Sequence, residues 1–188
     1  MHGLVNRAIE EFARVTYGDQ VWAAAAAVAG IDPRGFELMG HYEDRLTASL
    51  LSSLAARLGR STEEFAEDLG TWVAQRSSVR RLLRFAGSDF AAFMMTLEEL
   101  RGRGQLVAPG LELPALAVTV TGQGWRVDSE CNVLWLHAVA GMLHAMADDY
   151  GVLAVIEVEG SGILVDVPVV DFNKARPFSI SDPAVGAA

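Results

Sequence analysis

Residues 116–169 read LAVTVTGQGWRVDSECNVLWLHAVAGMLHAMADDYGVLAVIEVEGSGILVDVPV. Alternating apolar residues in this segment predict strands, at residues 116–121, 125–129, 152–158 and 163–169. The stretch at 132–150, between the two pairs of strands, predicts a long helix that ends at Gly151. Because a short glycine-containing turn joins the strands of each pair, the segment predicts two antiparallel hairpins around one helix.

The chain before residue 105 has helical spacing instead. Apolar residues at three- and four-residue intervals predict helices, over residues 3–17, 19–29 and 43–58, then a fourth that starts at Ser61 and carries Phe65, Leu69, Trp72 and Val73, then over 79–85 and 89–101. Ser61 followed by Glu64 is a capping-box signature for the fourth of these helices. Gly102 and Gly104 are expected to end the last one. The sequence therefore predicts an α+β fold, in which an N-terminal helical layer packs on an antiparallel sheet with a long helix.

Composition excludes several classes of protein. The 188 residues include 15 Lys and Arg against 24 Asp and Glu, a formal net charge of −9, which argues against a general nucleic-acid binder. A hydrophobic content of 51% excludes a disordered chain, and the one cysteine, Cys131, excludes an intrachain disulfide framework and a cysteine-rich zinc site. The N-terminus lacks a signal-peptide pattern, and no apolar stretch approaches the roughly 20 residues of a membrane span. We therefore expect a soluble, cytoplasmic protein that binds neither nucleic acid nor membrane.

Four stretches occur in an order that is typical of one family. They are MHGLVN at residues 1–6, the helix at 65–72, FMMTLEEL at 93–100 and LPAL at 113–116. Together with the final hairpin–helix–hairpin pattern, they resemble the haem–nitric oxide/oxygen binding (H-NOX, HNOB) family over most of the chain. The resemblance implies a single domain over residues 1–182, with a helical subdomain at about 1–60, an α/β subdomain at about 61–170 and a tail at 183–188. It also implies a gas sensor with a haem pocket between the two subdomains.

The sequence departs from this family at the residues that hold haem. In the family a histidine follows the FMMTLEEL-like helix and ligates the iron, whereas Arg101 stands at that place here. A guanidinium has no free lone pair at neutral pH and cannot ligate iron. The family's Tyr-x-Ser-x-Arg motif holds the haem propionates, but here Val127 and Cys131 flank the remaining Ser129. Arg126 is near but points to the opposite face of a strand from Ser129.

The ligand-pocket candidates come from the resemblance and from helical spacing. They are Leu4, Val5, Trp72, Met94, Leu97, Arg101, Pro114, Ser129 and His137. Arg101 could reach into a vacated pocket, or it could be a solvent-exposed cation at a helix end. His137 and His144 lie two turns apart on one helix, about 10 Å, which is too far for one metal ion to be held by both. No catalytic residue and no metal site is predicted.

A basic stripe is the candidate surface for a partner. Arg76, Arg80 and Arg84 repeat every four residues on an otherwise acidic protein. They could dock an acidic partner, which by the resemblance would be a histidine kinase or a cyclic-nucleotide signalling enzyme. A solvated helix face is the alternative. The sequence does not predict an oligomeric state.

Three functions are compared. The first is an H-NOX-like sensory or regulatory domain that does not bind haem in the usual way. Its pocket takes another apolar or anionic ligand, or side chains fill it and the domain acts by protein contact. The second is a haem-based NO or O2 sensor with a substitute axial ligand, His137 or His144. The third, a small-molecule enzyme, has little support, because no nucleophile–base arrangement or paired carboxylates stand in a convincing setting.

Overall fold

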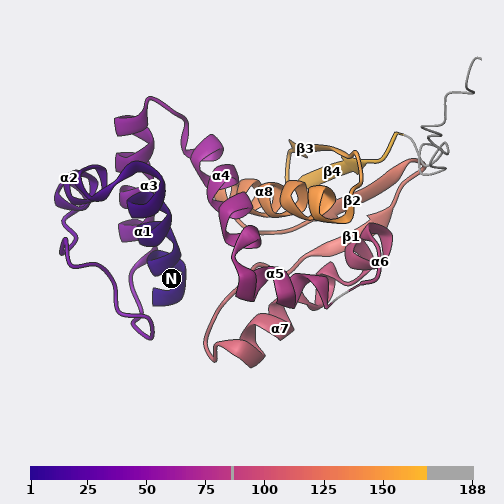
Figure 1. Cartoon of the computed structure of the whole chain (residues 1–188), viewed down its shortest axis with the longest axis horizontal. Helices are drawn as coiled ribbons and strands as arrows, with labels where there is room; N and C mark the ends of the chain where they lie inside the picture. The colour runs from indigo at the N-terminus through magenta and orange to yellow at the C-terminus, as the bar shows by residue number, and fades with distance from the viewer. Residues whose placement is uncertain (86, 169–188) are drawn as a thin grey trace, which may run out of the picture.

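The computed structural model describes residues 1–85 and 87–168, and it has the predicted order of helices and strands (Figure 1). The first elements are α1 (Gly3–Tyr17), α2 (Asp19–Ala29), α3 (Asp44–Leu58), α4 (Thr62–Gln75), α5 (Ser77–Arg84), α6 (Phe90–Met95), the 3-10 turn η1 (Leu97–Glu99) and α7 (Leu100–Val107). They are followed by β1 (Ala117–Val120), β2 (Gly124–Asp128), α8 (Val133–Tyr150), β3 (Val155–Glu159) and β4 (Gly162–Asp166). The expected tail at 183–188 lies outside the described residues.

The helices α1, α2 and α3 form a helical layer around an aromatic core. The ring of Phe12 on α1 lies 5.2 Å from the ring of Phe65 on α4, and Trp22 of α2 is fully buried. Leu50 and Leu54 of α3 complete the core. Figure 1 shows this layer on one side of the molecule and the sheet with α8 on the other, with α4 between them.

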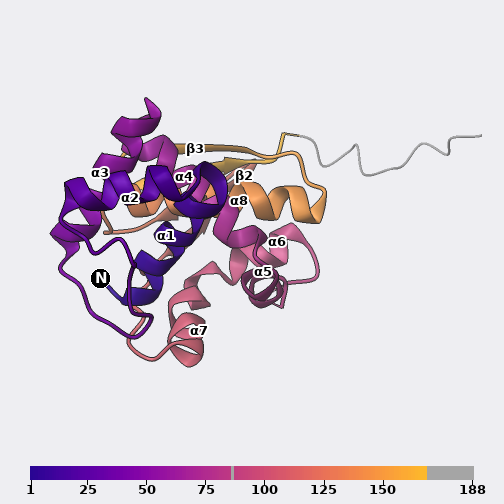
Figure 2. The ribbon, with the colours of Figure 1, turned by 60° about the vertical axis from the view of Figure 1, so that its left-hand side comes forward.

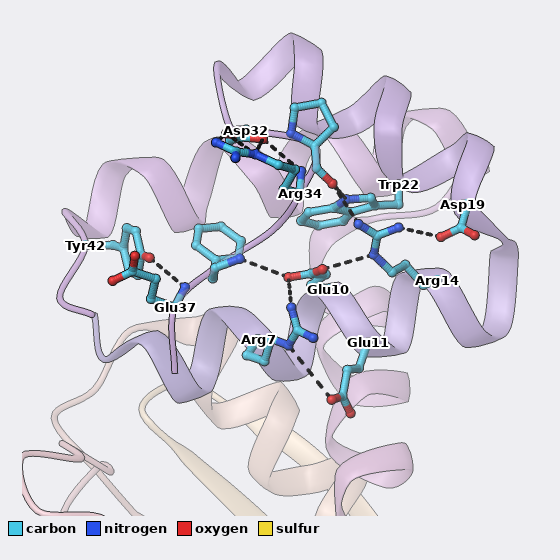
Figure 3. Close-up of polar contacts among 12 residues, drawn as sticks. Arg7, Glu10, Glu11, Arg14, Asp19, Trp22, Asp32, Arg34, Glu37 and Tyr42 are labelled. Carbon is cyan, nitrogen blue, oxygen red and sulfur yellow. Dashed lines mark hydrogen bonds and ion pairs between the residues drawn. The ribbon is translucent and has the colours of Figure 1, made fainter. Parts of the chain in front are cut away.

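A buried carboxylate ties this layer to the loop before α3 (Figure 3). Glu10 is 2% exposed and accepts hydrogen bonds from Arg7 at 3.1 Å, from Arg14 at 3.0 Å and from the backbone amide of Phe36 at 3.0 Å. Gly35 has a φ of +100°, and a Cβ at this residue would come closer than 3.0 Å to the Glu10 carboxylate. The buried charge is therefore compensated by donors that hold it from three sides.

The strands form one antiparallel sheet, and α8 covers one of its faces. Within the described residues the strand order is β1-β2-β4-β3, and both predicted hairpins are confirmed. Val127 of β2 and Ile163 of β4 are fully buried. They pack in one cluster with Leu136 and Leu143 of α8. The predicted α+β class, a helical layer with an antiparallel sheet and a long helix, is thus confirmed.

Two glycines let α4 and α8 cross in close contact. A Cβ on Gly70 would come closer than 3.0 Å to the carbonyl oxygen of Ala138, and a Cβ on Gly141 would do the same to the carbonyl oxygen of Glu67. The hydroxyl of Thr71 donates to the carbonyl of Gly141 at 3.0 Å. Because α4 also packs into the helical layer, this crossing connects the helical layer to the α/β layer.

The capping box at the start of α4 is confirmed. The Ser61 hydroxyl accepts from the amide of Glu64 at 3.1 Å, and the Glu64 carboxylate accepts from the amide of Ser61 at 2.9 Å. These bonds lower the pKa of the Glu64 carboxyl, with the Ser61 backbone amide as the main cause.

Replacing Ser61 by alanine is expected to lower the free energy of unfolding by about 1 kcal/mol, because an orphan amide at the helix start loses its acceptor. Urea denaturation followed by circular dichroism measures the change. Ser61→Asp, which supplies another good cap, is the control and should restore most of the loss. A loss from Ser61→Asp as large as that from alanine would show that the cap does not stabilise α4.

The predicted helix over residues 89–101 is wrong in its extent. Asp89 caps its start as expected, but α6 ends at Met95, where the Thr96 hydroxyl donates back to the carbonyl of Phe93 at 2.8 Å. After the turn η1, α7 continues through both glycines that were expected to end it. Gly104 is buried, and a Cβ there would come closer than 3.0 Å to the side chain of Leu113. This glycine therefore serves close packing and not helix termination.

Candidate functional site

A groove of about 730 Å³ lies beside Arg101, between α7, the loop before β1 and the end of β2. Its lining brings together three sequence-predicted residues, Arg101, Pro114 and Ser129. The other lining residues are Glu112, Leu113, Ala115, Leu116, Ala117, Asp128, Glu130, Cys131, Trp135 and Ser161. The volume falls in the range of about 300–1,000 Å³ that is usual for small-molecule sites. Residues from four separate parts of the chain thus meet at one surface depression.

Ser129 fixes the shape of the groove. Its hydroxyl donates to the carbonyl of Ala115 at 2.6 Å and accepts from the amide of Cys131 at 3.4 Å. Only 9% of Ser129 is exposed, so both bonds lie mostly out of solvent. The loop that carries Pro114 is thereby held against the end of β2.

Carboxylates outnumber cations around the groove. Three acidic residues, Glu112, Asp128 and Glu130, line the groove together with one basic residue, Arg101. Asp128 forms an ion pair with Arg126 at 2.9 Å. Glu112, Glu130 and Arg101 form no ion pair with any other described residue, and all three are exposed. The groove therefore presents an excess of negative charge to an incoming group.

A second, smaller space lies between the helical layer and the α/β layer. It measures about 120 Å³ and is lined by Val5 and Ile9 of α1, by Ala66 and Leu69 of α4 and by residues of α3 and α8. This is well below the roughly 300 Å³ at the lower end of small-molecule sites. The sequence-predicted residue Val5 lies here, and not in the groove.

Trp135 lines both the groove and the smaller space. Its indole belongs to the first turn of α8, where Asn132 caps the helix by accepting from the Trp135 amide at 3.1 Å. The sequence predictions did not include Trp135. The signal that could have found it is the combination of an Asn cap and a large aromatic residue three positions later, next to Ser129 and Cys131 in the chain.

The remaining pocket candidates line neither space. Met94 and Leu97 are buried in the core of the α/β layer and are 0% and 2% exposed. Trp72 packs against Phe12 in the helical layer, with ring centres 5.6 Å apart. Leu4 is half-buried on α1. The spacing argument that put Met94 and Leu97 on one face with Arg101 assumes one continuous helix, but α6 ends at Met95 and α7 begins at Leu100.

His137 and His144 both face Glu67 of α4. Nδ1 of His137 lies 3.5 Å from one carboxylate oxygen of Glu67, and Nε2 of His144 lies 3.5 Å from the other. His137 lines neither the groove nor the smaller space, although it was predicted as a pocket residue. The sequence reasoning missed Glu67, because its position opposite both histidines depends on the crossing of α4 and α8.

The arginines of the predicted basic stripe are bound within the molecule. Arg76 forms an ion pair with Glu11 of α1 at 3.0 Å. Arg80 donates to Asp149 at the end of α8 at 2.8 Å, and Arg84 lies 3.6 Å from the same carboxylate. These contacts attach α5 to its neighbours, so the stripe is partly neutralised as a surface for an acidic partner.

Metal ligands and membrane spans were sought in residues 1–85 and 87–168. In this part of the chain no three or more histidine, cysteine or acidic side chains gather closely enough to hold a metal ion. Within the same ranges, no helix has both the length and the apolar character needed to cross a membrane.

Comparison with known proteins gives one family and one fold. The family model described as haem-NO-binding (HNOB) matches residues 2–158. An unliganded Fe(II) H-NOX mutant from K. algicida has a TM-score of 0.78 at 15% identity, and the match covers 93% of this chain and 100% of that one. An H-NOX mutant from T. tengcongensis has a TM-score of 0.75 at 16% identity, and the match covers 90% of this chain and 98% of that one. An oxygen-binding H-NOX domain related to soluble guanylate cyclases has a TM-score of 0.69 at 15% identity, and the match covers 90% of this chain and 96% of that one. At these identities the structural likeness shows the fold.

Proposed function

Because the chain belongs to the haem-NO-binding (H-NOX) family, we propose that it is a sensory or regulatory domain that does not hold haem in the way usual for that family. It is not a catalyst. It signals to a partner protein through a different ligand or through protein contact. By its family, the partner is a histidine kinase or a cyclic-nucleotide signalling enzyme.

The observation that carries the proposal is Arg101 in the groove, together with Pro114 and Ser129. Arg101 stands where the family resemblance of the FMMTLEEL stretch, residues 93–100, implies the iron-ligating histidine. Its guanidinium carries five N–H donors and no acceptor, so it offers no electron pair to a metal ion. Neither His137 nor His144 lines the groove, and both lie against the Glu67 carboxylate instead.

The groove also fails to fit the carboxylates of a haem. Propionates need cationic or hydrogen-bonding partners, as charge-assisted bonds supply. Val127 is fully buried in the core, Cys131 has no charge to offer as a thiol, and Glu130 adds a carboxylate beside them. Like charges brought together at this site repel each other. The residues present therefore do not fit haem, and no step of the proposed function passes through it.

The space between the two layers supports the same conclusion. Its volume of about 120 Å³ leaves little room for a flat macrocycle, and Trp135 lines both this space and the groove. An effector of this domain would then have to act on the groove or on the crossing of α4 and α8. A ligand shifts a two-state equilibrium only by its difference in affinity for the two states.

Replacing Arg101 by histidine is expected to increase haem uptake, because an imidazole at this position supplies the missing axial ligand. Haem-supplemented expression followed by gel filtration, with absorbance in the Soret region, measures haem per chain. We expect wild-type protein to retain far less than one haem per chain, and Arg101→His to bind haem at least about tenfold more tightly, a gain of about 1.4 kcal/mol.

The matched control is Arg103→His, which adds a histidine to the same helix outside the groove. Arg103 forms an ion pair with Glu99, and it is not among the groove residues. Equal haem uptake by the two variants would show that the Arg101 position is not special. Stoichiometric haem in wild-type protein would overturn the proposed function itself.

A further inference from the structure

We propose that the groove beside Arg101 binds a small zwitterion, a molecule that carries an ammonium group and a carboxylate on one apolar body. This inference deepens the proposed function, because it names the chemical class of the ligand that replaces haem. It rests on that function in one respect, since the groove must be free of haem. The charges, the apolar lining and the rigid walls of the groove each support it.

Two carboxylates at the groove can receive an ammonium group. Glu112 precedes β1 and Glu130 follows β2, and both are exposed. In the described part of the chain neither forms an ion pair, whereas Asp128 is already paired with Arg126 at 2.9 Å. A ligand cation therefore gains a charge-assisted hydrogen bond here without breaking an existing pair.

Arg101 makes the groove suit a zwitterion better than a simple cation or anion. In Figure 1 and Figure 2, α7 lies at the lower edge of the molecule, and Arg101 is exposed in the first turn of this helix. Guanidinium binds a carboxylate through two parallel N–H···O bonds. A simple anion would be repelled by the glutamates and a simple cation by Arg101, whereas a ligand with both charges satisfies both.

Apolar side chains offer a surface to the body of the ligand. Pro114 and Trp135 line the groove, and both are half-buried. Arginine guanidinium groups lie over the rings of Trp22, Trp72 and Tyr150, whereas among the described residues no cation lies over Trp135. An indole without a cation of its own can stack on a ligand ring or take a ligand ammonium group.

The groove is held in shape before a ligand arrives. The Ser129 hydroxyl donates to the carbonyl of Ala115 at 2.6 Å and accepts from the amide of Cys131 at 3.4 Å. These bonds join the loop before β1 to the segment between β2 and α8, and both segments line the groove. Fixed walls reduce the ordering cost of binding, so a small molecule can bind with few contacts.

Cys131 reports on occupancy, because it lines the groove and is the one cysteine of the sequence. A bound ligand covers the thiol, so alkylation of full-length protein by iodoacetamide should slow as the free fraction falls. L-phenylalanine is the probe, and half-maximal protection is expected at or below about 1 mM. At ten times the half-protecting concentration the rate should fall about tenfold. Mass spectrometry measures the rate, and N-acetylcysteine in the same solutions controls for effects on the reagent.

Two analogues with the same ring test the need for both charges. Phenethylamine lacks the carboxylate, and 3-phenylpropanoate lacks the ammonium group. Each should need at least about a tenfold higher concentration than L-phenylalanine for half-maximal protection, because each leaves one kind of charge in the groove without a partner. Equal protection by either analogue in wild-type protein would overturn the proposal, since one of the two charges would then contribute nothing.

Charge-neutral variants assign each preference to its residues. Arg101→Gln should abolish the advantage of L-phenylalanine over phenethylamine, and Glu112→Gln with Glu130→Gln should abolish its advantage over 3-phenylpropanoate. The matched controls are Arg103→Gln and Glu157→Gln, which change charges outside the groove and should leave both ratios unaltered. The rate of each variant without probe is its own reference.

Two further outcomes would overturn the inference. One is no protection of Cys131 by any of the three probes at about 10 mM. The other is a change of the ratios in the control variants as large as that in the groove variants. All rates are measured on haem-free protein. Stoichiometric haem in wild-type protein defeats the proposed function, whereas absent protection in haem-free protein defeats this inference alone.

Discussion

Replacing Gly141 by alanine is expected to lower the free energy of unfolding by about 3 kcal/mol, because the added methyl group has no space. The new Cβ would come closer than 3.0 Å to the carbonyl of Glu67 and to the amide of Thr71, which are both backbone atoms of α4. Backbone atoms cannot turn aside as a flexible side chain does, so the two helices must separate. Urea denaturation followed by circular dichroism measures the loss.

Gly102→Ala is the matched control for this substitution. Gly102 is also in a helix, α7, but it is exposed and a Cβ there would meet nothing within 4 Å. Alanine should raise the free energy of unfolding at this position by about 0.5–1 kcal/mol, because glycine is a poor helix former. A loss below about 1 kcal/mol for Gly141→Ala would mean that α4 and α8 do not cross in the close contact described above.

Replacing Glu10 by alanine is expected to cost about 3 kcal/mol, because removing one member of a buried charged group leaves its partners unpaired. The guanidinium groups of Arg7 and Arg14 and the buried amide of Phe36 would lose their shared acceptor (Figure 3). The two arginines keep some access to water, which limits the cost. Thermal and urea denaturation measure the change.

The neighbouring residue supplies the control. Glu11 is about 40% exposed, and it forms ion pairs with Arg7 and Arg76. Glu11→Ala should cost less than about 1 kcal/mol, because surface pairs in water contribute little. If both variants lose the same small amount, the Glu10 carboxylate does not hold the loop before α3 to α1.

Much of the fold was predictable from local patterns. The bounds of α1 and α2, the Ser61 cap and both hairpins follow from period, capping residues and turn residues, which act within a few positions of each other. The break at Thr96 was not predictable in this way. Just after the break, the Glu98 carboxylate accepts a hydrogen bond from the backbone amide of Val118 in β1 at 2.9 Å, and a contact between segments so far apart leaves no periodic signal in the sequence.

The candidate site was predictable in part. Arg101, Pro114 and Ser129, three of the pocket candidates chosen from the sequence, line one groove. Trp135 and Glu67 were missed, because their roles depend on how α8 meets α4 and the end of β2. The face that His137 presents was not predictable either, since a shift of one or two residues along a helix turns a side chain to another face.

The most direct test of the central claim is a haemin titration of the purified wild-type protein, followed by absorption in the Soret region and by tryptophan fluorescence. A folded protein with Arg101 in place of the ligating histidine should show no saturable Soret band. Fluorescence should then change only weakly and without a defined stoichiometry. A sharp Soret band that saturates at one haem per chain would contradict the account, and would show that this groove or the space beneath Trp135 opens to accept haem after all.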